Sequence, residues 1–238
     1  MKKLDLLREL GKTPMFNNKR IRELIGKDNA YTWLVVHRLK QEGLIKKIER
    51  NKYTVHDDPL LVASNLAWPS YISCWAAVRY HNLTEQLPNV IHVVTTRARK
   101  RRKIEFGHAR IVFIRTRPSI LFGYEKIRLG GLEGFMAEPE KALIDSAFFR
   151  QISFSEIADM VKTNLNSIDA EKLVRHALKI GNSALAKRFG FLLEHLEAGA
   201  YGKLRKFVGK SYTKLDYAQL RDGKKSERWM VIDNVGLG

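Results

Sequence analysis

Apolar residues recur at helical spacing near the start of the chain, and a glycine follows each run. The stretch "KKLDLLREL" predicts a short helix that ends at Gly11, and a second helix is predicted from a cap at Asn17 or Asn18 to Gly26. The residues expected on the buried faces of these helices are Leu4, Leu7, Leu10, Ile21, Leu24 and Ile25. The chain is therefore predicted to begin with two short amphipathic helices.

A third helix is predicted from a cap at Asp28 to about Glu42, where Gly43 favours the left-handed backbone that ends helices. Its inward residues, at about 100° per residue, are expected to be Tyr31, Val35 and Leu39. Its outward residues are expected to be Asn29, Ala30, Trp33, His37 and Lys40. Amide, indole, imidazole and ammonium groups suit the base edges, sugars and phosphates of a major groove, so the outward side is the candidate recognition surface.

The stretch "LIKKIERNKYTV" predicts two short strands joined by a basic turn. The residues expected to anchor the strands are Leu44, Ile45, Ile48, Tyr53 and Val55. This leaves Arg50, Asn51 and Lys52 at the tip, where we expect them to lie against phosphates. Three helices followed by a basic hairpin resemble the winged helix-turn-helix, and the resemblance covers about Lys2 to Val55.

The resemblance implies that the third helix enters the major groove while the hairpin contacts the flanking backbone. The predicted DNA-binding residues are Lys27, Asn29, Ala30, Trp33, His37, Lys40, Arg50, Asn51 and Lys52. The alternative is a winged helix used only for protein contact, with Arg50 and Lys52 as ordinary solvated turn residues.

The segment after the hairpin predicts two helices separated around Trp68 and Pro69, because proline disfavours helical geometry in the residue before it. The β-branched runs "NVIHVVTT" and "ARIVFIRTR" follow, and "RARKRRKIEFGH" between them is interpreted as part of one long basic hairpin. The cations of this turn, which are not expected to be packed inside, are Arg97, Arg99, Lys100, Arg101, Arg102 and Lys103. Two interpretations stay open: a solvated loop and a second contact for an anion.

The remaining chain predicts two short strands, then four helices, then a tail of strand composition. The helix caps and ends are expected at Glu138–Glu140, at Ser153 or Ser155, at Ser167 and at Gly199. The tail is expected to close a sheet that begins near Val90. The whole pattern predicts an α+β fold, with a winged helix-turn-helix at 1–56, a connecting helix or linker at 57–67 and a mixed α/β C-terminal domain at 68–238.

The net charge of the chain indicates the class of its partner more directly than any single motif. The 238 residues include 43 Lys and Arg against 25 Asp and Glu, a formal net charge of +18. Such an excess predicts a polyanionic partner, because each paired phosphate releases condensed counterions, and double-stranded DNA is the leading candidate. An anionic membrane surface competes, but no apolar run reaches the roughly 20 residues that span a bilayer, so a cytoplasmic protein is expected. The single cysteine, Cys74, is interpreted as a buried structural thiol.

Enzyme signatures are missing from the sequence. The seven histidines are scattered and one cysteine cannot build a local zinc cluster, while neither a nucleophile elbow nor a phosphate-binding loop occurs. A magnesium-dependent nuclease is the enzymatic alternative, built from Glu133, Glu138, Glu140 and Asp145. Glu138 and Glu140 also fit the first turn of a helix, so we predict no catalytic residue, no metal and no cofactor.

Four segments in order resemble one family. "SYISCWAAVRYHNLTEQLPNVIHVVTT", "AEPEKALIDSAFF", "RFGFLLEHL" and "YTKLD…RWMVIDN" are similar to the AbiEi-type antitoxins, the transcriptional regulators of abortive-infection type IV toxin-antitoxin systems. The resemblance implies a repressor of its own operon whose C-terminal domain opposes a nucleotidyltransferase-like toxin without forming a stable complex. Two alternatives stay open: a stand-alone regulator with the same domains, and a protein-interaction module that antagonises a toxin without binding DNA.

Overall fold

The computed structural model describes residues 2–199 and 201–237, and its contacts divide the chain into two compact units. Unit 1 comprises Met1–Tyr71, Asn89–Arg115 and Lys126–Phe135. Unit 2 comprises Ile72–Pro88, Thr116–Glu125 and Met136–Gly238. Because both units are discontinuous in sequence, each is closed by contacts between distant segments. Helices and strands are both present, so the fold is α+β.

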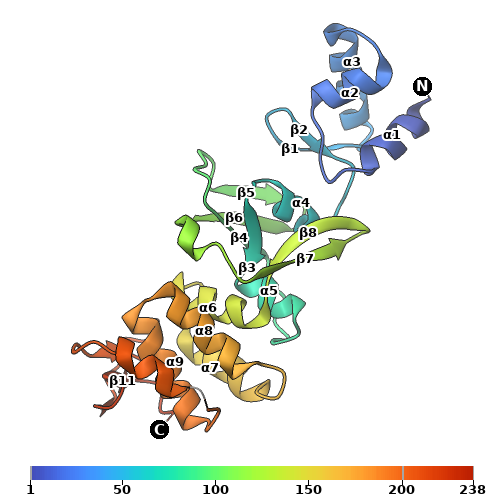
Figure 1. Cartoon of the computed structure of the whole chain (residues 1–238). Coiled ribbons are helices and arrows are strands. Elements are labelled where there is room, and N and C mark those ends of the chain that lie inside the picture. Colours follow the sequence, from blue (N-terminus) through green and yellow to red (C-terminus); the bar gives the residue numbers. More distant parts are fainter. Residues whose placement is uncertain (1, 200, 238) are drawn as a thin grey trace. The chain divides into compact units, whose positions relative to one another are not determined.

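Three helices form the N-terminal part of unit 1 (Figure 1): α1 (Lys3–Gly11), α2 (Asn18–Ile25) and α3 (Asn29–Gln41). The side chains of Asn17 and Asp28 cap α2 and α3, and Gly26 and Gly43 have the left-handed backbone expected after a helix. The core of this part contains Leu6, Leu10, Phe16, Ile21, Val36, Leu39, Ile45 and Tyr53. The expectation for Leu4 is wrong: it is exposed, because Leu6 and Leu10, four residues apart, form the buried row of α1.

A two-stranded antiparallel hairpin follows the helices, with β1 at Lys46–Glu49 and β2 at Lys52–Thr54. Ile48 and Tyr53 are buried, and Asn51 adopts a positive φ of 56° in the turn. The segment between α1 and α2 pairs with β2, since Phe16 and Tyr53 exchange two backbone hydrogen bonds of 2.9 Å. The hairpin is therefore joined to the helices through its backbone as well as its core residues.

The chain then forms a six-stranded sheet with the order β5-β6-β4-β3-β8-β7. Its strands are β3 (Ser70–Ser73), β4 (Val90–Thr95), β5 (Lys103–Phe106), β6 (Ala109–Arg115), β7 (Tyr124–Leu129) and β8 (Leu132–Ala137). The helices α4 (Pro59–Asn65) and α5 (Trp75–Tyr80) lie on either side of β3 in sequence. The two predicted helices are present, but β3 was not predicted, because the period of so short an apolar run does not distinguish strand from helix.

The predicted long basic hairpin is wrong. β4 and β6 are parallel, with Val90 opposite Arg110 and Thr95 opposite Arg115. The basic segment leads instead into β5, which turns back on β6 as a short antiparallel hairpin through Gly107. Gly107 has a φ of 59°, which a glycine adopts without strain. The β5 strand thus reverses the chain direction and allows β4 and β6 to run in parallel.

Besides α5, unit 2 contains the C-terminal tail and the helices α6 (Pro139–Phe148), α7 (Phe154–Thr163), α8 (Ala170–Ile180) and α9 (Ser183–His195). Two short 3-10 helices, η1 and η2, lie at Pro118–Ile120 and Tyr201–Phe207. Ser153 caps α7 with a reciprocal capping box, as predicted. The cap of α8 is Asp169 rather than Ser167, and α9 ends at His195, before Gly199.

The tail does not close the large sheet, so that expectation is also wrong. Its strands β9 (Thr213–Lys214), β10 (Lys224–Ser226) and β11 (Val231–Asp233) form a separate sheet of order β10-β11-β9. Trp229 is fully buried within unit 2, and its indole Nε1 donates to the Glu194 carboxylate on α9 at 2.5 Å. The composition of the tail correctly predicted strands. These strands pair with one another and the tail packs against α9 of its own unit, rather than joining the six-stranded sheet.

In the part of the chain that the structure describes, none of the helices has the length and apolar character needed to cross a membrane.

Candidate nucleic-acid interface

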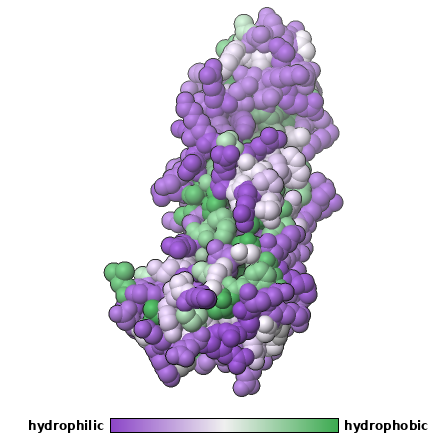
Figure 2. All heavy atoms as spheres, turned by 60° about the vertical axis from the view of Figure 1, so that its left-hand side comes forward, coloured by the Kyte–Doolittle hydropathy of each residue, from purple (hydrophilic) through white to green (hydrophobic). Residues whose placement is uncertain are grey.

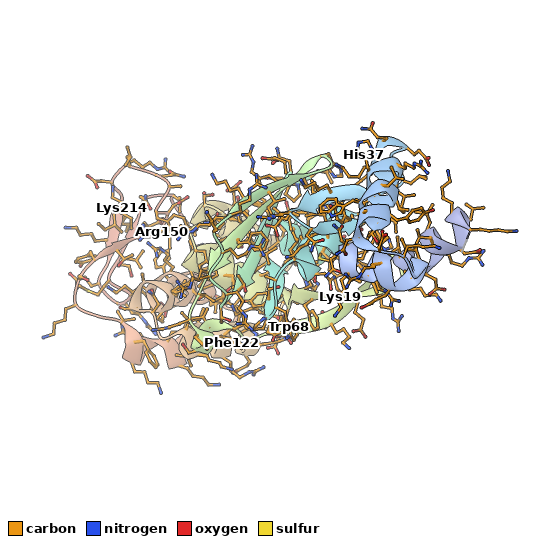
Figure 3. All side chains as sticks on the ribbon, turned by 90° about the horizontal axis from the view of Figure 1, so that it is seen from above. Lys19, His37, Trp68, Phe122, Arg150 and Lys214 are labelled. Atoms are coloured by element: carbon orange, nitrogen blue, oxygen red, sulfur yellow. The ribbon has the colours of Figure 1, made fainter. Side chains whose placement is uncertain are left out.

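The solvent side of α3 carries the predicted recognition residues. Asn29, Ala30, Trp33, His37 and Lys40 are all exposed. Trp33 is 59% exposed, although a tryptophan usually buries most of its surface. His37 lies on the outer side of α3 (Figure 3). On the face drawn in Figure 2, hydrophilic residues cover most of the N-terminal helices, at the top of the picture.

The buried side of α3 differs from the prediction. Thr32, Val36 and Leu39 are buried, whereas Tyr31 is 46% exposed. The Thr32 hydroxyl donates to the backbone oxygen of Asp28 at 2.7 Å, so a polar residue reaches the core with its hydrogen bond satisfied. The inward face is therefore rotated from the predicted one. The exposed residues of α3 that sequence reasoning missed are Tyr31, Leu34, Arg38 and Gln41.

A hydrogen bond from α2 fixes the orientation of the Asn29 side chain on this face. Arg22 Nη1 on α2 donates to Asn29 Oδ1 at 2.9 Å, which orients the amide at the first turn of α3. The cations Lys27, Arg38 and Lys40 are exposed and form no ion pair with any described residue. Elsewhere in the helices, by contrast, Lys3 pairs with Glu42 at 2.8 Å. The end of α2 and the surface of α3 thus present cations available to phosphates.

The three residues of the hairpin tip, Arg50 to Lys52, differ in whether their side chains have partners within the protein. Arg50 is exposed and has no ion-pair partner among the described residues. Asn51 Oδ1 accepts from the backbone N–H of Asn18 at 3.0 Å. Lys52 Nζ lies 3.3 Å from Glu49 Oε2 and donates to the Leu66 carbonyl at 3.4 Å. Of the predicted tip contacts, Arg50 is the one with an available charge.

The basic loop, residues 97–103, contains both cations that bind other parts of the protein and cations that are exposed. Arg97 Nε donates to the Trp68 carbonyl at 2.9 Å, while Lys100, Arg101, Arg102 and Lys103 are exposed and form no ion pair with a described residue. The expectation that the loop is not packed inside is wrong for Arg99, whose side chain is 14% exposed. Its guanidinium lies 4.0 Å from the centre of the Phe113 ring and donates to Glu49 Oε1 at 2.5 Å.

The basic loop and the hairpin tip line one groove within unit 1. The groove has a volume of about 530 Å³, and its lining residues are Glu49, Arg50, Ala98, Arg99, Lys100 and Arg101. Burial opposes ionisation of Glu49, but the hydrogen bond and charge of Arg99, helped by Lys52, outweigh it and lower the pKa of Glu49. The carboxylate is therefore ionised at neutral pH and compensated by two cations.

The acidic residues considered for a nuclease do not assemble into a metal site. Glu133 on β8 pairs with Lys126 on β7 at 2.9 Å, in unit 1. In unit 2, Glu138 and Glu140 each lie 3.3 Å from Lys172. Across the described ranges 2–199 and 201–237, no three His, Cys, Asp or Glu side chains are grouped so that they could hold a metal ion.

Asp145 and Cys74 belong to the interior of unit 2. Asp145 forms an ion pair with Lys141, one turn earlier on α6, and accepts from the Ser73 hydroxyl at 2.9 Å. Both members of the pair are fully buried. Cys74 is buried as predicted, and burial raises the pKa of its thiol, which keeps it protonated. These groups have the partners and the burial of structural residues.

The comparisons with known proteins bear on the fold. No protein-family model matches the chain, and no curated protein matches it. Among solved structures, the chain is similar to the crystal structure of the RV2827C protein from Mycobacterium tuberculosis. The TM-score is 0.65, the identity is 12%, and the match covers 96% of this chain and 89% of that chain. The likeness therefore spans nearly all of both chains and shows a shared α+β architecture.

Proposed function

We propose that this protein is a sequence-specific transcriptional regulator that binds double-stranded DNA through α3 and the β1–β2 hairpin. The exposed face of α3 is the observation that carries the proposal. It displays an indole, an imidazole, an oriented amide, and cations that form no ion pair with a described residue, on a helix of 13 residues. A helix fits the width of the major groove, where such groups distinguish base edges.

The order of the elements supports the same docking. Three helices precede the hairpin, and the Phe16–Tyr53 backbone pair joins the hairpin to them. This is the arrangement in which a winged helix-turn-helix places its third helix in the groove and its hairpin on the adjacent backbone. The net charge of +18 supports a polyanionic partner.

The resemblance to AbiEi-type antitoxins extends the proposal. In that view the protein represses its own operon in the cytoplasm, and its C-terminal part opposes a nucleotidyltransferase-like toxin without a stable complex. The sequence segments that carry the resemblance support this extension, and the gene beside this one would show whether a toxin is encoded there.

Binding of the purified chain to the DNA upstream of its gene tests the proposal. We expect a clear preference over random duplex in fluorescence anisotropy. Trp33→Ala and Asn29→Ala should each reduce that preference, because a base contact is worth roughly 1–3 kcal/mol of discrimination. The matched control is Leu87→Ala, which removes a side chain that is 83% exposed in unit 2.

Three results would contradict the proposal. A wild-type chain with equal affinity for upstream and random DNA would exclude specific recognition of that region. Changes below a few tenths of a kcal/mol in both helix variants would move the recognition surface away from α3. Absence of any DNA binding would favour the protein-interaction alternative.

A further inference from the structure

Glu49 lies at a junction of three segments of unit 1. Its Oε1 accepts from Arg99 Nη2 at 2.5 Å, and its Oε2 lies 3.3 Å from Lys52 Nζ. Both cations also donate to the carbonyl of Leu66, Arg99 at 3.0 Å and Lys52 at 3.4 Å. We call Glu49, Lys52, Arg99 and the Leu66 carbonyl the Glu49 cluster. It connects the hairpin, the end of α4 and the basic loop.

The Glu49 cluster removes two cations from the predicted set of phosphate contacts. Arg99 is held on one side by Glu49 and on the other by the Phe113 ring, 4.0 Å away. The exposed fractions of the Arg99 and Glu49 side chains are 14% and 15%, so water screens this pair less than a surface pair. A guanidinium held on both sides is suited to fixing a loop rather than to contacting a ligand.

The groove beside the cluster has a different character. Arg50, Lys100 and Arg101 line it, are exposed, and form no ion pair with the described part of the chain. The carboxylate in the groove wall is already compensated by Arg99 and Lys52. The groove therefore presents positive charge from two segments separated by about fifty residues in sequence.

We propose that the Glu49 cluster locks the hairpin and the basic loop into one groove, where Arg50, Lys100 and Arg101 bind the sugar-phosphate backbone of the duplex contacted by α3. Arg99 is then a positioning residue and touches no phosphate. This inference rests on the proposed DNA binding and extends its contact surface beyond the first 56 residues.

The chemistry of the groove favours a nucleic-acid backbone over a small anion. The groove cations Arg50, Lys100 and Arg101 are exposed and lie on two segments, which suits successive phosphates along a strand. A site for one free phosphate would instead enclose the ion with buried donors. The groove also begins at Arg50, the tip residue that the hairpin places toward the flanking backbone.

Salt titration of binding to the upstream duplex and to random duplex tests the inference. Lys100→Ser/Arg101→Ser should lower the magnitude of the slope of log affinity against log salt by roughly 2, because each lost phosphate contact contributes about 0.9. Both side chains are exposed, so this variant removes little packing. Arg102→Ser/Lys103→Ser is the matched control, with the same charge loss on the same loop outside the groove.

The role of Arg99 is tested by non-additivity. Arg99→Met, which keeps an unbranched chain against Phe113, should lower the slope in the wild-type background. It should leave the slope unchanged in the Arg50→Ser/Lys100→Ser/Arg101→Ser background, where all three proposed groove contacts are already removed. Glu49→Gln should act in the same direction as Arg99→Met while keeping the shape of the side chain. Thermal melting of each variant shows that it is folded during the titration.

Each outcome decides between the inference and the proposed function. If the slope is unchanged in Lys100→Ser/Arg101→Ser, or falls equally in the control, the groove does not contact phosphates. The proposed function would still hold in that case, provided that the wild type prefers upstream DNA. An Arg99→Met effect that persists in the Arg50→Ser/Lys100→Ser/Arg101→Ser background makes Arg99 itself a phosphate contact and overturns its positioning role. If the wild type lacks sequence preference yet the groove variants still flatten the slope on random duplex, the proposal of a sequence-specific regulator is refuted. The inference that the groove binds the DNA backbone is then kept.

Discussion

At the scale of the residue, Glu49 couples protonation to the stability of unit 1. Arg99 and Lys52 stabilise its ionised form in the folded chain, so its pKa lies below the ordinary 4.5 despite the opposing effect of burial. A carboxyl with a lowered folded pKa contributes stability that is complete above the unfolded value and is lost as pH falls through the folded value. Protonation of Glu49 should therefore weaken the Glu49 cluster.

We expect the difference in unfolding free energy between wild type and Glu49→Gln to be largest near neutral pH and to shrink as the pH falls below about 4.5. Urea denaturation of both proteins from pH 7 to pH 3 measures it. Glu125→Gln, at an exposed position, is the comparison variant. A difference that stays constant over this range would show that the ionisation of Glu49 does not stabilise the fold.

At the scale of the element, α9 owes its packing to a glycine. Gly190 faces the six-membered ring of Trp229, and a Cβ at that position would overlap the ring carbons. Trp229 is fully buried, so the indole has little room to withdraw. Gly190 therefore allows the tail with β11 to lie against the helix.

Gly190→Ala should lower the unfolding free energy of unit 2 by about 1–3 kcal/mol, because overpacking a full core forces side chains and backbone to shift. Gly202→Ala is the matched control, since nothing lies within 4 Å of its added Cβ. Chemical denaturation followed by tryptophan fluorescence reports both. Equal stability of the two variants would mean that the helix and the tail separate readily.

At the scale of the whole molecule, the candidate DNA contacts and the helical C-terminal part fall in different units. Every residue predicted to bind DNA, from Lys27 to Lys52, belongs to unit 1, and so do the groove residues Lys100 and Arg101, whereas α6 to α9 belong to unit 2. If the protein is an antitoxin of the AbiEi type, repression and toxin antagonism should then be separable by substitution.

We expect the triple variant Trp33→Ala/Arg50→Ala/Lys100→Ala to lose repression of a reporter fused to the upstream region and to keep the protection of cells that express the neighbouring toxin gene. Reporter activity and growth, measured at matched protein levels, test this expectation. Loss of both activities in a folded variant would tie antagonism to the DNA-binding surface. Loss of repression alone is the expected result.

Much of unit 1 could be predicted because its signals are local. The caps Asn17 and Asp28, the glycines after the helices and the buried hairpin residues depend on neighbours within a few positions. The outward face of α3 was predicted in part. Its rotation was missed because the hydrogen bond from Thr32 to the Asp28 carbonyl makes a polar side chain acceptable in the core.

The strong positive charge, the α+β class, the capped helices and the exposure of Trp33, His37 and Arg50 could all be predicted from the amino-acid sequence, since they follow from composition, period and turn chemistry. Three features became visible in the folded chain alone: β4 and β6 are parallel, the tail forms its own sheet, and Arg99 is packed between Glu49 and Phe113. The physical reason is that strand partners and buried ion pairs join residues far apart in the chain. Their energies depend on which surfaces meet, and no local pattern encodes that.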